Sequence, residues 1–301
     1  MKTKKPHTLK MQDTFQFECT ACGKCCFNNT VLINCYDLIR LRHGLKASTT
    51  QILQEGLVGL SIGPFSGLPV CTIKFQSLSK EFTKCPFLSP TIKKGKLKNI
   101  KSKSELKRVL ELGAEIEKWL CSVHEDRPIA CRLYPLGRVK NINQKTGKVK
   151  ETFILQDTEK FCPGFKEKKK QTLTQYLKES KFKNYDEGSA KFASLMNKII
   201  KSGFFAPTER NDKNRAKLKK ESKVLFILGN IMYNFDSFNY FSEDKRVLKT
   251  INDPKATQKD FMYVFNKIDT LVFHLVKMYK KHGEDDEAIM KIINSIQTKG
   301  V

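Results

Sequence analysis

The stretch Cys19-Thr20-Ala21-Cys22-Gly23-Lys24-Cys25-Cys26 holds four of the ten cysteines in this 301-residue chain. Two overlapping C-x-x-C units share Cys22, and a C-x-x-C turn lets two sulfur atoms point to the same side, as a tetrahedral metal site requires. Adjacent side chains diverge, so Cys26 can serve a second site or bridge two metal ions. The stretch therefore predicts a region that folds around one or two metal centres.

The other six cysteines lie between residues 35 and 162. Four have distinctive neighbours: Cys85 begins C-P-F-L, Cys162 begins C-P-G, and Cys121 and Cys131 bracket a segment that contains Arg-Pro. Cys35 and Cys71 lie beside a predicted helix start and in a predicted strand. We expect these last two to be buried free thiols.

The thiols are expected to be reduced. Residues 1–12 are basic, but no apolar segment of the kind found in a signal peptide follows them. No stretch approaches the ~18 apolar residues of a membrane helix. We therefore expect a cytoplasmic protein without a transmembrane segment, a setting in which disulfides are rare and metal binding is favoured. A disulfide framework is the alternative, although it is typical of small secreted domains.

The chain is strongly basic, with a net charge of +25 and lysine-rich runs at residues 93–98, 166–170 and 213–220. Such a charge can indicate a nucleic-acid partner. However, only nine of the 56 basic residues are arginine, which is the usual residue for bidentate phosphate contacts. A basic nucleic-acid-binding adaptor is therefore an alternative function and not the main hypothesis.

Apolar periodicity predicts the secondary structure. In the first half we expect helices over residues 36–45 and 49–58, a loop over 59–69 and a strand over 70–75. The capping box Ser102-x-x-Glu105 predicts a helix that reaches Trp119. Residues 136–142 and 149–155 flank a glycine-bearing turn and predict a hairpin. In the second half we expect helices within residues 173–177, 192–200, 224–238, 261–278 and 289–296.

These elements predict a mainly α fold with a small β-hairpin element. We expect a cysteine-rich, metal-organised domain over residues 15–166, followed by an α-helical bundle over residues 170–301. The aromatic stripe of the second half is expected to form its core.

Four motifs together resemble the CxxCxxCC cysteine-cluster family (YkgJ-like), whose domain is described as chelating zinc or iron. They are the C-x-x-C-G-x-C-C opening, the C-P-F-L step, the C-x₅-R-P-x-x-C-R-x-Y-P segment and the late C-P-G. The resemblance covers about residues 15–200, and the segment between Cys85 and Cys121 is longer than the family pattern implies. It implies eight metal ligands: Cys19, Cys22, Cys25, Cys26, Cys85, Cys121, Cys131 and Cys162.

One branch of this family resembles flagellin lysine N-methylases, in which an iron–sulfur cluster and S-adenosylmethionine are implicated. The resemblance thus implies a second alternative, a cluster-dependent protein lysine N-methyltransferase or oxidoreductase that acts on a protein substrate. The sequence itself offers no catalytic residue and no glycine-rich nucleotide-binding loop. Whether the protein is an enzyme stays open here.

Thiolate ligands suit both zinc and iron–sulfur clusters. Cys19, Cys22 and Cys25 have the spacing of a bacterial ferredoxin run, but that run continues with three residues and Cys-Pro, and position 29 is asparagine. The C-x-x-x-C-x-x-C triad of radical S-adenosylmethionine enzymes is also absent. Both iron–sulfur and zinc remain open, and the resemblance favours iron–sulfur.

Four thiolates around a divalent metal leave a net negative charge, which nearby cations would offset. Arg127 and Arg132 lie close in sequence to Cys121 and Cys131, so we expect them to contribute to the cofactor site. Ordinary surface ion pairs with Glu125 and Asp126 are the alternative. His124 could replace a sulfur ligand, but eight thiolates make this unnecessary.

Overall fold

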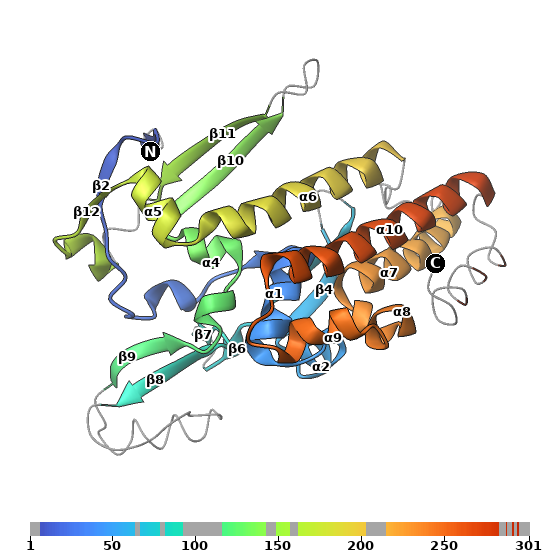
Figure 1. The fold of residues 1–301 in the computed structure, drawn as a ribbon, viewed down its shortest axis with the longest axis horizontal. Coiled ribbons are helices and arrows are strands. Elements are labelled where there is room, and N and C mark those ends of the chain that lie inside the picture. Colours follow the sequence, from blue (N-terminus) through green and yellow to red (C-terminus); the bar gives the residue numbers. More distant parts are fainter. Residues whose placement is uncertain are drawn as a thin grey trace. The chain divides into compact units, whose positions relative to one another are not determined.

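The computed structural model describes residues 7–63, 67–78, 82–92, 116–142, 149–156, 162–202 and 215–282, together with positions 287, 291 and 294. The chain forms two compact units that alternate along the sequence (Figure 1). The cysteine unit comprises residues 1–29, 75–124 and 129–183. The helical unit comprises residues 30–74, 125–128 and 184–301. The division into residues 15–166 and 170–301 stays a prediction.

The expectation of a mainly α fold is wrong. The structure is 52% helical and 21% strand, and the described strands form five small sheets. Most of these strands have two to five residues, too few to show alternation in the sequence. Several pair with strands that are distant along the chain, so local patterns give no sign of them.

The predicted hairpin is confirmed in the cysteine unit. β10 (Leu136–Ile142) and β11 (Val149–Leu155) pair antiparallel, with Leu136 opposite Leu155. β1 (His7–Leu9) adds to the other side of β11, which makes a three-stranded sheet. The turn between the hairpin strands lies outside the described residues.

Apolar residues from all parts of the cysteine unit form its core. β2 (Thr14–Gln16) pairs with β12 (Lys170–Thr172) and carries Phe15 inward. α4 (Ile129–Leu133), the short η3 turn (Pro163–Lys166) and α5 (Leu173–Glu179) complete the framework. The buried cluster contains Leu9, Phe15, Phe17, Leu133, Leu136, Phe153, Cys162, Leu173, Leu177 and Phe182.

Two further strand pairs of the unit flank or contain two of the motif cysteines, Cys85 and Cys121. β6 (Gln76–Ser77) pairs with β7 (Thr83–Lys84), and β8 (Leu88–Ile92) pairs with β9 (Ile116–Cys121). The helix predicted to run from Ser102 to Trp119 is wrong at its end, because residues 116–121 are strand. Trp119 lies opposite Pro90, so pairing with a distant strand overrides the helical spacing. Residues 101–115 lie outside the described part.

The helical unit begins with a small sheet and two capped helices. β5 (Pro69–Ile73) lies between β3 (Leu32–Ile33) and β4 (Val58–Ile62). The strand predicted at 70–75 is thus confirmed, whereas the loop predicted over 59–69 is wrong for the residues of β4. α1 (Cys35–Leu45) confirms one predicted helix, and α2 (Thr49–Gln54) confirms the first part of the helix predicted over 49–58, whose last residue begins β4 instead. Each of the two helices starts with a capping box.

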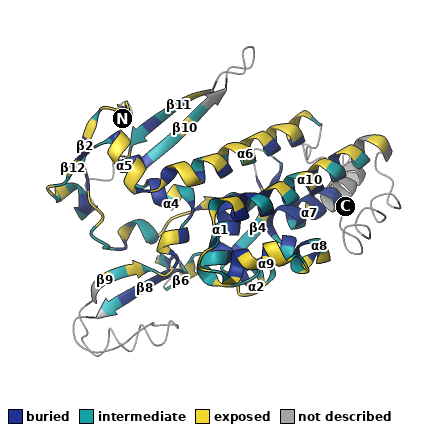
Figure 2. Cartoon of the chain, viewed as in Figure 1, coloured by how far each residue is buried: buried dark blue, intermediate teal, exposed yellow. Residues whose placement is uncertain are grey.

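In the described residues, the remaining helices combine buried and exposed positions (Figure 2). They are α6 (Phe182–Lys201), α7 (Arg215–Tyr233), the η5 turn (Phe235–Ser237), α8 (Asn239–Ser242), α9 (Lys245–Asn252) and α10 (Gln258–His282). The apolar stripe predicted within 261–278 is buried along α10. Of the helix predicted at 289–296, only positions 291 and 294 are described. No described helix combines the length and the apolar character needed to cross a membrane.

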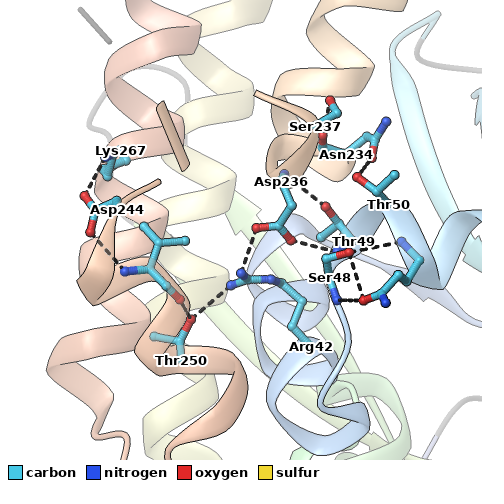
Figure 3. Close-up of polar contacts among 12 residues, drawn as sticks. Arg42, Ser48, Thr49, Thr50, Asn234, Asp236, Ser237, Asp244, Thr250 and Lys267 are labelled. Atoms are coloured by element: carbon cyan, nitrogen blue, oxygen red, sulfur yellow. Dashed lines mark hydrogen bonds and ion pairs between the residues drawn. The ribbon is translucent and has the colours of Figure 1, made fainter. Parts of the chain in front are cut away.

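A buried ion pair joins elements of the helical unit (Figure 3). Arg42 of α1 is fully buried, and its Nη2 lies 2.7 Å from Oδ1 of Asp236 in η5. Arg42 Nη1 donates to Thr250 Oγ1 at 2.9 Å, and the Thr49 N–H donates to Asp236 Oδ2 at 2.7 Å. Because both charges have hydrogen-bond partners, the pair fixes α1 against η5 and α9.

Candidate metal centre

The first cysteine stretch lies alongside β7 in the cysteine unit. Cys25 and Cys26 belong to the η1 turn (Lys24–Cys26), and their sulfur atoms are 3.8 Å apart. The Cys85 N–H donates to the Cys26 carbonyl at 2.9 Å, and Phe27 forms an isolated bridge with Lys84. Backbone hydrogen bonds thus bring residues that are about sixty positions apart in sequence next to each other.

Cys121 approaches the same place from β9. It lies opposite Leu88 in the β8–β9 pair, and the Leu88 N–H donates to the Cys85 carbonyl at 3.1 Å. The Ser122 N–H also donates to the Phe87 carbonyl at 2.8 Å. Three separate segments therefore bring together Cys25, Cys26, Cys85 and Cys121, which we call the cysteine group.

The environment of Cys85 disfavours a free thiolate. Burial, with smaller contributions from Cys121 and Cys25, raises the pKa of this thiol to about 11, although a hydrogen bond with the Phe87 backbone and the charge of Lys84 act to lower it. A bound metal cation reverses this balance, because a coordinating thiol is deprotonated outright. The same burial that keeps the thiol protonated without metal would strengthen a thiolate–metal contact.

Gly23 lets the cysteine stretch pack closely on β9. Its φ is +73°, and a Cβ placed there would lie 2.7 Å from the Trp119 Cβ. The Trp119 N–H donates to the Ala21 carbonyl at 2.8 Å, and the Phe27 ring meets the indole edge to face. Only glycine combines this backbone conformation with so close an approach.

The other four motif cysteines have different surroundings. Cys19 is exposed, whereas Cys22 and Cys131 are half-buried. Cys162 is buried in the apolar core, and the Glu18 N–H donates to the Gly164 carbonyl at 3.0 Å, which brings the C-P-G segment beside the start of the cysteine stretch. All eight predicted ligands thus belong to the cysteine unit.

Cys35 and Cys71 differ from these eight. Both are free, fully buried thiols of the helical unit, as the sequence predicted. Burial raises the pKa of Cys35, and it raises that of Cys71 to about 12. These thiols are therefore unreactive at neutral pH.

The donor set fits a thiophilic metal or cluster. As the described side chains stand, no three of His, Cys, Asp and Glu are arranged to hold a metal ion together. The chemistry of the group is nevertheless consistent, because its donors are all cysteine sulfur atoms. The buried Thr20 Oγ1 also has no hydrogen-bond partner among the described residues, and it lies next to Cys19 in the chain.

The two predicted arginines have different positions. Arg132 is buried in the cysteine unit, and its Nη1 donates to the Ser180 carbonyl at 2.8 Å. Arg127 belongs to the segment 125–128 of the helical unit. A role of either arginine side chain towards a cofactor stays a prediction. His124, the residue that could replace a sulfur ligand, is exposed.

The sequence analysis did not identify Lys84, a buried cation next to the cysteine group. Lys84 is 9% exposed and lies in β7, directly before Cys85. Its Nζ donates to the Leu88 carbonyl at 2.7 Å and to the Cys85 carbonyl at 3.1 Å. Burial lowers its pKa, and the nearby Cys85 and Cys26 oppose that effect. Nothing in the sequence distinguishes this lysine from the many exposed ones.

Comparison with known proteins identifies the region. Residues 18–163 match the CxxCxxCC family, described as a putative zinc- or iron-chelating domain, so the predicted resemblance is confirmed. No curated protein and no solved structure matches the chain. The family description supports metal binding in general. It lends no support to S-adenosylmethionine, methyl transfer or nucleic-acid binding, which stay predictions.

Proposed function

We propose that the cysteine unit binds an iron–sulfur cluster or zinc through cysteine thiolates. Residues 18–163 of the chain, which include all eight candidate ligands, match a domain described as zinc- or iron-chelating. The observation that carries this proposal is the approach of three distant segments at the cysteine group. A structural tetrahedral centre needs four such donors, and this group offers Cys25, Cys26, Cys85 and Cys121.

The remaining motif cysteines are candidates for a second centre. Cys19, Cys22, Cys131 and Cys162 lie in the same unit, and a second set of four thiolates would satisfy one more metal ion or cluster. Cys25 and Cys26 can share one centre, because their sulfur atoms lie 3.8 Å apart although the residues are adjacent in the chain. The number of metal ions bound per chain would distinguish one centre from two.

The donor chemistry restricts the metal to thiophilic ions. Thiolates select zinc, copper(I) and iron–sulfur clusters over the hard cations magnesium and calcium. The ferredoxin-like spacing of Cys19, Cys22 and Cys25 favours a cluster, although the usual fourth cysteine before proline is absent. We place iron–sulfur first and zinc second.

The bound metal would supply folding energy to a region of short strands. The β6–β7 and β8–β9 pairs have only two strands each, and isolated two-stranded ribbons are marginally stable in water. Metal–thiolate bonds that join these ribbons to the cysteine stretch would stabilise the folded state directly.

Anaerobic purification with elemental analysis and a visible spectrum tests the proposal. Iron and inorganic sulfide with broad visible absorption would identify a cluster. A colourless protein with stoichiometric zinc would identify the second choice, because zinc has a filled d shell. Protein that is folded but retains neither metal, and takes up neither on reconstitution, would contradict the proposal.

A further inference from the structure

Lys84 is a buried cation, and no carboxylate of the described residues pairs with it. Only 9% of it is exposed, and its Nζ donates to two backbone carbonyls, those of Cys85 and Leu88. Among the residues that the structure describes, no Asp or Glu oxygen lies within ion-pair distance of its Nζ. Lysine is almost never buried in this way unless an anion pairs with it.

The surroundings of Lys84 indicate which negatively charged group offsets its charge. Burying an ammonium ion is costly unless a negative charge offsets it. Its chain neighbour is Cys85, and Lys84 forms a β-bridge with Phe27, the residue after Cys26. Neutral thiols do not offset a positive charge. Metal-bound thiolates do, because four of them around a divalent ion carry a net charge of −2.

We propose that Lys84 is the counter-cation of the metal–thiolate centre. Its positive charge offsets part of the negative charge of the centre. This inference rests on the proposed function. It assigns to one buried lysine the role that the sequence suggested for Arg127 and Arg132. Lys84 directly precedes Cys85 in the chain and lies opposite Phe27, the residue after Cys26.

Two substitutions of Lys84 separate its charge from its size. Lys84→Gln removes the charge but keeps N–H donors for the two carbonyls, and Lys84→Arg keeps the charge. Lys24→Met is the matched control, because Lys24 is exposed although it is next to Cys25. Each protein is loaded with zinc or with a reconstituted cluster, and its metal stoichiometry and dissociation constant are measured by chelator competition.

We expect Lys84→Gln to weaken metal affinity about tenfold or more, as is usual when a partner of metal ligands is lost. Lys84→Arg and Lys24→Met should stay within about threefold of the wild-type affinity. If the centre is a cluster, the reduction potential of Lys84→Gln should also be more negative than that of Lys84→Arg, since a nearby cation favours the reduced, more negative state.

The failures of the two proposals are distinguishable. Wild-type protein that takes up no metal would contradict the proposed function itself. Wild-type protein that binds metal while Lys84→Gln and Lys84→Arg bind equally well, or lose affinity equally, would overturn the role of the charge. Should Lys84→Gln fail to fold, Lys84→Met provides a neutral side chain of matched length, and the comparison with Lys84→Arg decides.

Discussion

Asp126 Oδ1 lies 2.6 Å from Arg40 Nη2, and this ion pair holds residues 125–128 in the helical unit. The other Asp126 oxygen lies 2.7 Å from His43 Nδ1, and the Tyr185 hydroxyl donates to the Glu125 carbonyl at 3.0 Å. The chain on both sides of this segment belongs to the cysteine unit. Residues 125–128 are therefore anchored by α1 within the helical unit.

Asp126→Ala should strongly destabilise the protein. Asp126 is 5% exposed, and its removal leaves the largely buried Arg40 without its carboxylate, a change that costs about 3–5 kcal/mol for buried pairs. The free energy of unfolding in denaturant measures the loss. Glu179→Gln is the control, because its ion pair with Lys169 is exposed and contributes at most about 1 kcal/mol. Equal effects of the two substitutions would contradict the anchoring role.

Gly23→Ala should disturb the packing of the cysteine stretch on β9. The new Cβ would meet the Trp119 Cβ at 2.7 Å, and a left-handed conformation already costs alanine about 1–2 kcal/mol. Trp119 is the single tryptophan of the chain, so its fluorescence reports on this contact. We expect a shifted emission spectrum and a lower affinity for metal.

Gly56→Ala provides the control for this prediction. Gly56 also has a positive φ, of +67°, but nothing lies within 4 Å of the position of its Cβ. It should show the backbone cost alone, with unchanged tryptophan emission and metal affinity. A Gly23→Ala protein that resembles Gly56→Ala in both tryptophan emission and metal affinity would show that the close approach to Trp119 is unimportant.

Asp244 should make the helical unit sensitive to acid. Although burial opposes it, hydrogen bonds from Lys267 and Tyr263 lower the pKa of Asp244 to about 2. A carboxyl whose pKa is lower in the folded state stabilises the protein above its unfolded value of about 3.9, and this contribution is lost as the pH falls towards 2. The unfolding free energy should therefore fall between about pH 5 and 2.

Asp244→Asn tests the sign of this effect. The variant should be less stable than the wild type at neutral pH, and its stability should fall less steeply below about pH 5. Denaturant unfolding at several pH values gives the change of the unfolding free energy with pH for the wild type and for the variant. Parallel curves for the two proteins would exclude Asp244 as a source of the acid sensitivity.

The long amphipathic helices and the hairpin could be predicted because their signals are local. The apolar stripe of α10 repeats over several turns, and β10 and β11 lie on either side of one short turn. β9 could not be predicted in the same way. Its Trp119 and Ile116 have helical spacing, and only the distant partner β8 makes them strand.

The candidate metal site also combines a local sequence signal with contacts between distant segments that the sequence does not reveal. The cysteine spacing predicts eight candidate ligands, and the structure brings four of them towards one place through backbone pairing. The sequence offers no reason to single out Lys84, because a buried lysine and an exposed one look alike among so many lysines. The Asp126–Arg40 pair is also invisible, since these residues are 86 positions apart and meet only in the folded chain.

Metal content of two matched cysteine variants tests the central claim most directly. Cys85 and Cys71 are both buried free thiols in β-rich surroundings, but only Cys85 belongs to the cysteine group. After anaerobic purification, Cys85→Ala should lose at least one metal centre per chain, whereas Cys71→Ala should keep the wild-type stoichiometry. Full metal content in folded Cys85→Ala protein, or equal loss in both variants, would contradict the account.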